Sequence, residues 1–203
     1  MGRDGAEFPA SKDWIEPGGN GLVPTRALLR NRSCARVLEQ VRRVRHFFPE
    51  LEKVTIRVGL TRAADGYASI ESPAIWLNPR RLAHHTIAHE MIHLLQSRGL
   101  VPGGEKSADL HALARHVVLA DALPGYLAVP NEMRYLWDSR RPEHRRLLCG
   151  TARDALVAGA GSYRRSIRIF EERLPGRWTE GLEGRGAGEA SIHQPSLFET
   201  SSL

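Results

Sequence analysis

The pentapeptide His89-Glu90-Met91-Ile92-His93 restricts the fold of this chain more than any other feature. It lies within a predicted helix that spans residues 78–98, and residues four apart share one face of a helix. Both imidazoles therefore point the same way, as two ligands of one zinc ion require. Glu90 falls beside the ion, where it can take a proton from zinc-bound water. The pattern predicts a zinc site on a helix that packs into a core.

A catalytic zinc ion commonly has three protein ligands and one open position, so a third ligand is expected from a following helix. Glu105 opens the next predicted helix and is our candidate. Asp109, four residues on, faces the same way and is suited to accept the distal N–H of a ligand histidine, which fixes the ring. His111 is the alternative third ligand, although it lies on a different face of that helix from Glu105.

The remaining elements come from hydrophobic periodicity, caps and turn signals. The predicted elements are a short helix near 25–31, a helix at 34–48, strands at 54–60, 67–70 and 74–77, and helices at 105–121, 131–148 and 152–174. Asn78 and Pro79 are expected to start the helix that carries the pentapeptide. The fold class is therefore α+β with a small antiparallel or mixed sheet. Its expected parts are a flexible arm (1–32), a catalytic core (33–125), a helical C-terminal extension (126–174) and a disordered tail (175–203).

The two motifs together resemble known proteases. His89-Glu90-x-x-His93 followed by Glu105-Lys106-Ser107-Ala108-Asp109 is similar to the HExxH and ExxAD pattern of gluzincin metallopeptidases. In that clan the second glutamate is a zinc ligand and the aspartate supports a histidine ligand. The His-Glu-Met-Ile-His string also resembles the SprT/Spartan proteases, which digest proteins crosslinked to DNA and use a third histidine. Residues 105–130 are loosely similar to the IrrE/ImmA-type peptidases, which cleave repressors.

The resemblance covers about residues 50–125 and implies a minimal zincin core. It implies that the strand at 74–77 borders the cleft and pairs with an extended substrate. It further implies a zinc endopeptidase whose water is activated by Glu90. The oxyanion stabiliser is left open among four side chains, namely Tyr126, Tyr135, His111 and His116. We interpret His84 and His85 as ordinary helix residues.

The chain has a net charge of +6, and only three of its 29 basic residues are lysines. Residues 49–125 carry eight basic and eight acidic groups, so the basic excess lies in the flanking helices. A neutral catalytic unit held by basic surfaces fits a protein that acts near nucleic acid. The candidate DNA contacts are Arg42, Arg43 and Arg45, or Arg164, Arg165 and Arg168. A GC-rich genome is the alternative source of the arginines.

The C-terminal segment contains Gln194-Pro195-Ser196-Leu197-Phe198 in a polar, glycine-rich stretch. It resembles the QxxLF peptide with which bacterial repair and replication proteins dock on the sliding clamp. In that motif Gln194 would supply hydrogen bonds, and Leu197 and Phe198 would fill an apolar pocket. A disordered tail suits this use because it can order on binding.

Two cysteines, Cys34 and Cys149, cannot form a disulfide framework, and no apolar run is long enough to span a membrane. We therefore expect a cytoplasmic protein with free thiols. The main functional prediction is a zinc peptidase that acts on DNA-associated proteins in crosslink repair. The alternatives are a peptidase that cuts one repressor in a stress response, and a non-catalytic adaptor that binds DNA or the clamp.

Overall fold

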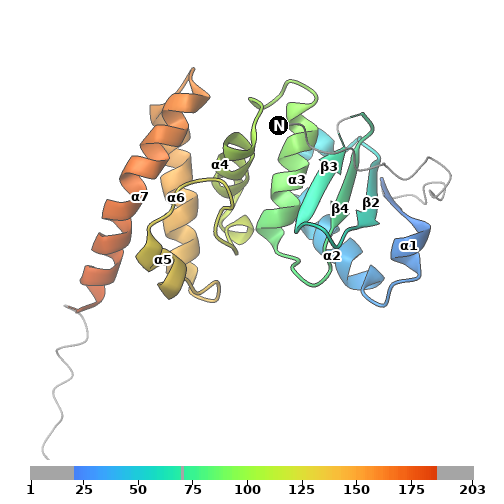
Figure 1. The fold of residues 1–203 in the computed structure, drawn as a ribbon. Helices are drawn as coiled ribbons and strands as arrows, with labels where there is room; N and C mark the ends of the chain where they lie inside the picture. Colours follow the sequence, from blue (N-terminus) through green and yellow to red (C-terminus); the bar gives the residue numbers. More distant parts are fainter. Residues whose placement is uncertain (1–20, 70, 187–203) are drawn as a thin grey trace, which may run out of the picture.

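The computed structural model of the chain describes residues 21–69 and 71–186. Figure 1 shows a small sheet with α1, α2 and α3 at one end of the molecule, and α5, α6 and α7 at the other. Helix α4 lies between α3 and α6 and contacts both. Among these residues no helix combines the length and the apolar character needed to cross a membrane. Gln194, Leu197 and Phe198 lie outside the described residues, so the clamp-binding peptide stays a prediction.

The sheet has four short strands in the order β1-β2-β4-β3. They are β1 (Leu22–Pro24), β2 (Ile56–Leu60), β3 (Gly66–Ser69) and β4 (Ala74–Leu77). Strands β1, β2 and β4 are parallel neighbours, whereas β3 runs antiparallel to β4. The α+β class with a mixed sheet is therefore confirmed.

The sheet end of the molecule has its own hydrophobic core. The helices that build it are α1 (Arg26–Leu29), α2 (Cys34–Arg45) and α3 (His84–Gln96), with a 3-10 turn η2 (Pro49–Leu51). Val37, Val41 and Val44 of α2 are fully buried in one cluster with strand residues and with Met91 of α3. Because this face of α3 supplies core contacts, its opposite face is left for polar side chains.

The other end is a helical unit with a second core. Its elements are η3 (Val117–Leu119), α5 (Asn131–Leu136), α6 (Pro142–Ala158) and α7 (Tyr163–Gly186). Helix α4 (Glu105–Arg115) belongs to both cores, since Ala108 and Ala112 pack in the first and Leu110 and Leu113 in the second. The metal-ligand candidates on α4 are thus held from two sides.

The predicted flexible arm is wrong for residues 21–32. Leu22 and Val23 are buried in β1, which pairs with β2, and Thr25 caps α1 by accepting a hydrogen bond from Leu28 N (3.0 Å). A strand of three residues is too short to show alternation, which explains why the sequence pattern missed it.

The strand at 74–77 is not a free edge beside the cleft. As β4 it pairs with β2 on one side and with β3 on the other, and all four of its residues are buried. A continuous apolar run is typical of such a central strand. On that side of the sheet the outermost described strand is β3.

Several helix boundaries differ from those predicted. The predicted helices at 131–148 and 152–174 are replaced by α5, α6 and α7, because Pro142 starts α6 and the turn after it needs two glycines. Gly161 has φ +86°, and a Cβ on Gly159 would lie 2.2 Å from Ser166 Oγ. Helix α7 continues through Pro175 and buries Trp178, so the tail prediction is wrong for residues 175–186.

The two motif helices are shorter than predicted. Helix α3 begins at His84, and Asn78 instead makes a turn in which its Oδ1 accepts from Arg80 N (3.1 Å). Helix α4 ends at Arg115, because His116 is extended and its Nδ1 accepts a hydrogen bond from Val118 N (3.2 Å). Both motifs nevertheless fall entirely within helices, as expected.

Candidate metal centre

Three side chains from α3 and α4 converge at one point. His89 Nε2 lies 3.0 Å from His93 Nε2 and 3.0 Å from Glu105 Oε2, and His93 Nε2 lies 3.2 Å from the same oxygen. Tetrahedral zinc with ligand bonds of 2.0–2.1 Å would separate its ligand atoms by about 3.3 Å. We call His89, His93 and Glu105 the outer trio, and its spacing fits one zinc ion.

The other ring nitrogens decide where the hydrogens lie. His89 Nδ1 is 2.8 Å from Asp109 Oδ1, and His93 Nδ1 is 2.8 Å from Gln96 Oε1. Gln96 donates its own N–H groups to the carbonyls of Pro102 and Gly104, so its oxygen must face His93. Since both Nδ1 atoms donate, both Nε2 atoms present lone pairs to Glu105 and to each other.

A centre where three electron-pair donors meet requires a cation. Burial lowers the pKa of His89, but the carboxylates of Asp109, Glu90 and Glu105 outweigh it and hold that pKa above its ordinary value. In the free protein a proton at this point would meet the same need. A metal ion bound there would displace that proton, so the donor set fits a divalent ion such as zinc.

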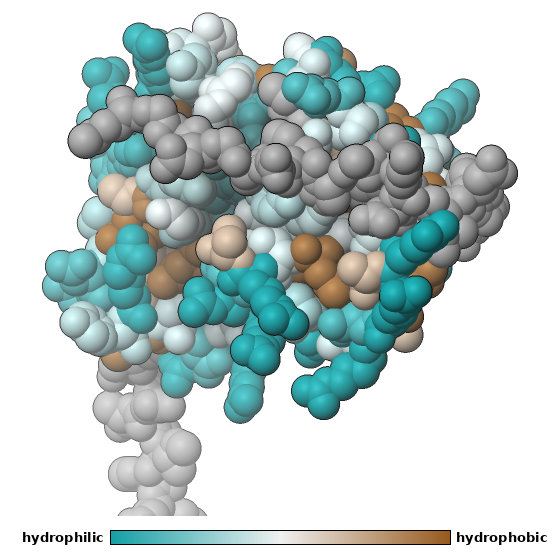
Figure 2. Space-filling model, turned by 45° about the vertical axis from the view of Figure 1, so that its right-hand side comes forward, coloured by the Kyte–Doolittle hydropathy of each residue, from teal (hydrophilic) through white to brown (hydrophobic). Residues whose placement is uncertain are grey.

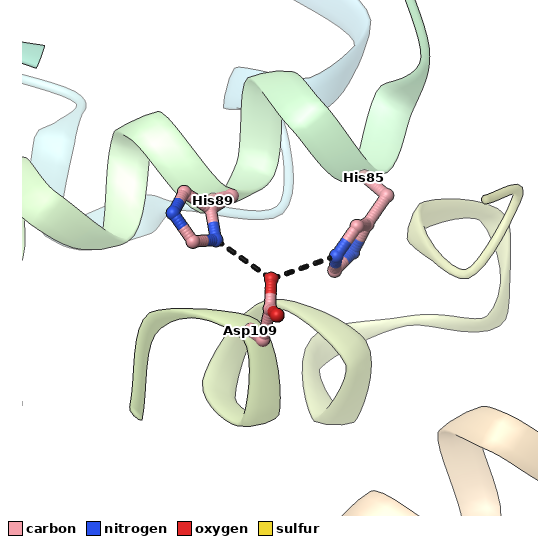
Figure 3. Close-up of side chains that lie close together, drawn as sticks. All are labelled: His85, His89 and Asp109. Atoms are coloured by element: carbon pink, nitrogen blue, oxygen red, sulfur yellow. Dashed lines mark hydrogen bonds and ion pairs between the residues drawn. The ribbon is translucent and has the colours of Figure 1, made fainter. Parts of the chain in front are cut away.

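Asp109 lies between His85 and His89 and joins the two rings, as Figure 3 shows. Its Oδ1 accepts from His85 Nε2 (3.1 Å) and from His89 Nδ1 (2.8 Å), and its Oδ2 accepts from Tyr126 N (2.7 Å). Burial alone would raise the pKa of Asp109, but these two histidines lower it far below the ordinary aspartate value. Asp109 is thus a buried carboxylate that accepts three hydrogen bonds.

His85, His89 and Asp109, which we call the inner trio, could also hold a metal by spacing alone. All three are buried, and their contacts are already complementary without an ion. The interpretation of His85 as an ordinary helix residue is wrong. Histidines at 85, 89 and 93 repeat every four residues on one face, which is the signal that could have identified it.

Glu90 lies on α3 beside the outer trio, and among the described residues Glu90 Oε2 makes no hydrogen bond to it. Its side chain is packed against β3, where a Cβ on Gly66 would lie 2.8 Å from Glu90 Oε1. Glu90 Oε2 is buried without a hydrogen-bond partner among the described residues. Burial raises the pKa of Glu90 to about 7. A carboxyl group with this pKa can both accept and donate a proton near neutral pH.

Of the candidate oxyanion stabilisers, one is next to the trio. The Tyr126 ring stacks on the His89 ring at 5.6 Å between centroids, and Tyr126 is half exposed. His111 Nδ1 is bound to Ser107 O (2.9 Å) and is in neither trio. His116 stacks on Phe47, and Tyr135 is 88% exposed on α5.

A further carboxylate supports the start of α3. Asp121 accepts hydrogen bonds from the backbone N–H groups of His84 and His85, both at 2.9 Å. These are the first free N–H donors of α3, the helix that carries the histidines of both trios. Asp121 therefore acts as a cap supplied from 36 residues away, which local sequence patterns do not reveal.

The two groups of candidate DNA contacts differ in how far they are engaged. Arg45 donates to three backbone carbonyls, and Arg43 is paired with Glu39. Arg164, Arg165 and Arg168 are exposed at the start of α7, where Arg168 pairs with Glu172 (3.8 Å) and Arg164 lies over the ring of Tyr163. Both cysteines are free thiols, and burial raises the pKa of Cys149.

Comparison of the chain with protein-family models, with curated proteins and with solved structures finds no match.

Proposed function

We propose that the chain is a zinc-dependent endopeptidase of the zincin type, built on residues 33–125. The observation that carries this proposal is the outer trio, in which His89, His93 and Glu105 present three lone pairs within 3.2 Å of one another. Glu90 is the adjacent carboxylate that such chemistry needs. The set of two histidines and one glutamate is one that catalytic zinc uses in proteins.

A zinc ion held by the outer trio would polarise a peptide carbonyl and lower the pKa of a water molecule to about 7. Glu90 would accept the proton of that water and deliver it to the leaving nitrogen. The positive charge of the ion would also lower the pKa of Glu90 from its value of about 7 and so favour the proton-accepting form. Tyr126, which stacks on His89, is the candidate donor to the developing oxyanion.

The sheet supports an extended peptide as substrate. Strand β3 has no further strand beside it among the described residues, and Gly66 at its start touches Glu90. A peptide that paired with the outer side of β3 would run past Glu90, and main-chain pairing makes little demand on sequence. The substrate-binding strand that we propose is thus β3 rather than β4.

We propose proteins associated with DNA as the substrates, as in the repair of DNA–protein crosslinks. The support is the basic charge outside the catalytic core and the clamp-binding-like peptide Gln194 to Phe198. A peptidase that cuts one repressor would use the same centre. The two differ in outcome, since a repressor peptidase cuts one target at one bond, whereas a crosslink protease cuts many proteins and is stimulated by DNA.

The test compares Glu90→Gln with the intact protein and with Glu71→Gln, which changes an exposed glutamate outside both trios. Zinc content and cleavage of DNA-bound proteins are measured with and without DNA. We expect about one zinc per chain in all three proteins, and a loss of cleavage of at least a hundredfold in Glu90→Gln alone. Full cleavage by Glu90→Gln, or a protein without zinc, would contradict the proposal. Binding to DNA or clamp without any cleavage would favour the adaptor.

A further inference from the structure

The net charge of the chain is concentrated in one segment. Residues 21–48 contain seven arginines and a single acidic residue, Glu39. Their net charge of +6 equals that of the whole chain, and the other residues balance 22 basic against 22 acidic groups. This segment comprises β1, α1 and α2, so the charge is gathered on neighbouring elements of the folded protein.

Some of these arginines make hydrogen bonds or ion pairs within the protein. Arg45 binds the carbonyls of Leu51, Glu52 and Val54, which fixes the turn after α2. Arg43 forms an ion pair with Glu39, and Arg36 donates to the carbonyl of Pro79. Arg45 therefore has a structural role in the turn after α2.

The other four are exposed to solvent, and one of them, Arg42, lies on α2. Arg26, Arg30 and Arg32 are exposed on α1 and the turn that follows it, and the described part of the chain offers none of them a carboxylate partner. Arg26 and Arg30 are four residues apart, on one side of α1 and its C-cap. We call Arg26, Arg30 and Arg32 the arginine face.

The partner that this chemistry fits is a polyanion with closely spaced phosphates. Guanidinium groups bind phosphate oxygens in a fork, and duplex DNA carries about one negative charge per 1.7 Å of axis. Figure 2, in which the α1 end of the molecule is turned forward, shows long hydrophilic side chains standing out between small, separate apolar patches. Membrane binding would need an apolar helix face as well, whereas Leu29, 44% exposed, is the large apolar side chain that α1 exposes.

We propose that the arginine face binds the phosphate backbone of duplex DNA. In Figure 1 it lies at the α1 end of the molecule, beyond the sheet from the outer trio on α3 and α4. Bound DNA would therefore leave the metal centre open to a protein substrate. The inference concerns DNA binding alone and does not depend on zinc or on peptidase activity.

The test is a titration of a fluorescent 20-base-pair duplex with the full chain, followed by anisotropy at several salt concentrations. The test variant is Arg26→Ala/Arg30→Ala/Arg32→Ala. Each phosphate neutralised contributes about 0.9 to the slope of log affinity against log salt, so we expect the slope to fall by about 2.7. Glu90→Gln should bind DNA as the intact protein does, which separates this result from the fate of the proposed peptidase.

A matched control removes the same charge elsewhere. Arg164→Ala/Arg165→Ala/Arg168→Ala takes three exposed arginines from α7, at the other end of the molecule. We expect this variant to keep the salt slope and the affinity within about twofold of the intact protein. The proposal is overturned if the two triple variants lose affinity equally, if only the α7 variant loses it, or if the intact protein binds anionic vesicles but not duplex DNA. Circular dichroism checks that both variants remain folded.

Discussion

Two sets of three side chains share His89, and they are chemically opposite. In the inner trio one ring N–H of each histidine faces Oδ1 of Asp109, so donors meet an acceptor. In the outer trio two nitrogen lone pairs and a carboxylate oxygen face each other at 3.0–3.2 Å. The hydrogen bonds of the inner trio need no ion. The electron pairs of the outer trio repel one another unless a cation lies between them.

The difference separates a hydrogen-bonded cluster from a candidate metal site. Both trios satisfy a simple distance criterion. The inner trio is fully buried, while His93 and Glu105 keep 18% and 36% of their side-chain surface exposed, which leaves access for an ion and a ligand. The hydrogen bond to Asp109 in the inner trio fixes the His89 ring, and this ring position points Nε2 at the outer trio.

The largest expected effect comes from breaking the outer trio. Glu105→Ala should weaken zinc binding on the order of a thousandfold, because a binding free energy of roughly 10–16 kcal/mol is shared among three or four ligands. The measurement is competition with a zinc chelator. Glu132→Ala is the control, since it too removes a glutamate from the first turn of a helix. Unchanged affinity in Glu105→Ala would exclude Glu105 as a ligand.

Gly66→Ala should slow peptide cleavage by about a hundredfold while zinc affinity is kept. The added methyl group would lie 2.8 Å from Glu90 Oε1, and a shift of about 1 Å in a catalytic group can cost this much. Gly59→Ala also creates a clash in the sheet, with Trp76, but away from Glu90. Equal losses of activity in the two variants would point to general damage to the sheet instead.

Asp109→Asn tests the link between the trios. The asparagine side chain is nearly the same size, but its neutral oxygen is a weaker acceptor for the His89 N–H. Zinc affinity should fall by 10- to 100-fold, the usual effect of losing the partner of a ligand histidine. Isothermal calorimetry gives the affinity, and an unchanged value would mean that Asp109 does not orient His89.

His85→Ala affects the inner trio alone. Asp109 would keep its bonds to His89 and to Tyr126 N, so zinc affinity should change by less than tenfold. The metal-free protein should lose roughly 1–3 kcal/mol of unfolding free energy, because a buried carboxylate loses one donor. Urea denaturation measures this, and a variant that binds no zinc while folded would make His85 a ligand.

The smallest effect concerns Asp121, which supports the start of α3 and so both trios. Burial raises the pKa of Asp121, but hydrogen bonds from His84 and the helix N–H groups outweigh it and hold the pKa below its ordinary value of 3.8. Ionised Asp121 therefore stabilises the fold above about pH 4, by about 1 kcal/mol for a cap, and this is lost as the pH falls through the folded-state pKa. The stability difference between the intact protein and Asp121→Asn should shrink on acidification, and a difference that grows would contradict this.

The sequence predicts the local parts of the site well and the distant supports poorly. The spacing of His89 and His93 on a helix, and of Glu105 and Asp109 on the next, follows from helical periodicity, and in the structure these four side chains lie close together. Gly66 and Asp121 come from other parts of the chain, 24 and 31 residues from Glu90, and only the tertiary fold brings them to α3.

In the fold too, the sequence predicts elements with a strong local pattern and not those that depend on distant contacts. The strong amphipathic pattern predicts α2 within a few residues, but β1 depends on pairing with β2 and has no local signal. The extension through Pro175 was missed because Trp178 and Leu174 pack in the second core, which outweighs the loss of one backbone hydrogen bond. Where the local sequence pattern is weak, tertiary contacts determine which residues form a helix or strand.

Helix α4 belongs to both hydrophobic cores and also carries Glu105. A zinc ion that ties α4 to α3 would therefore act as a clasp between the two ends of the molecule. By linkage, the bound ion would stabilise every state in which α3 and α4 remain in contact by the free energy of its own binding. Partial detachment of the C-terminal helices and release of the metal thus become one cooperative event, and chelation should speed amide exchange in α6 as well as in α4.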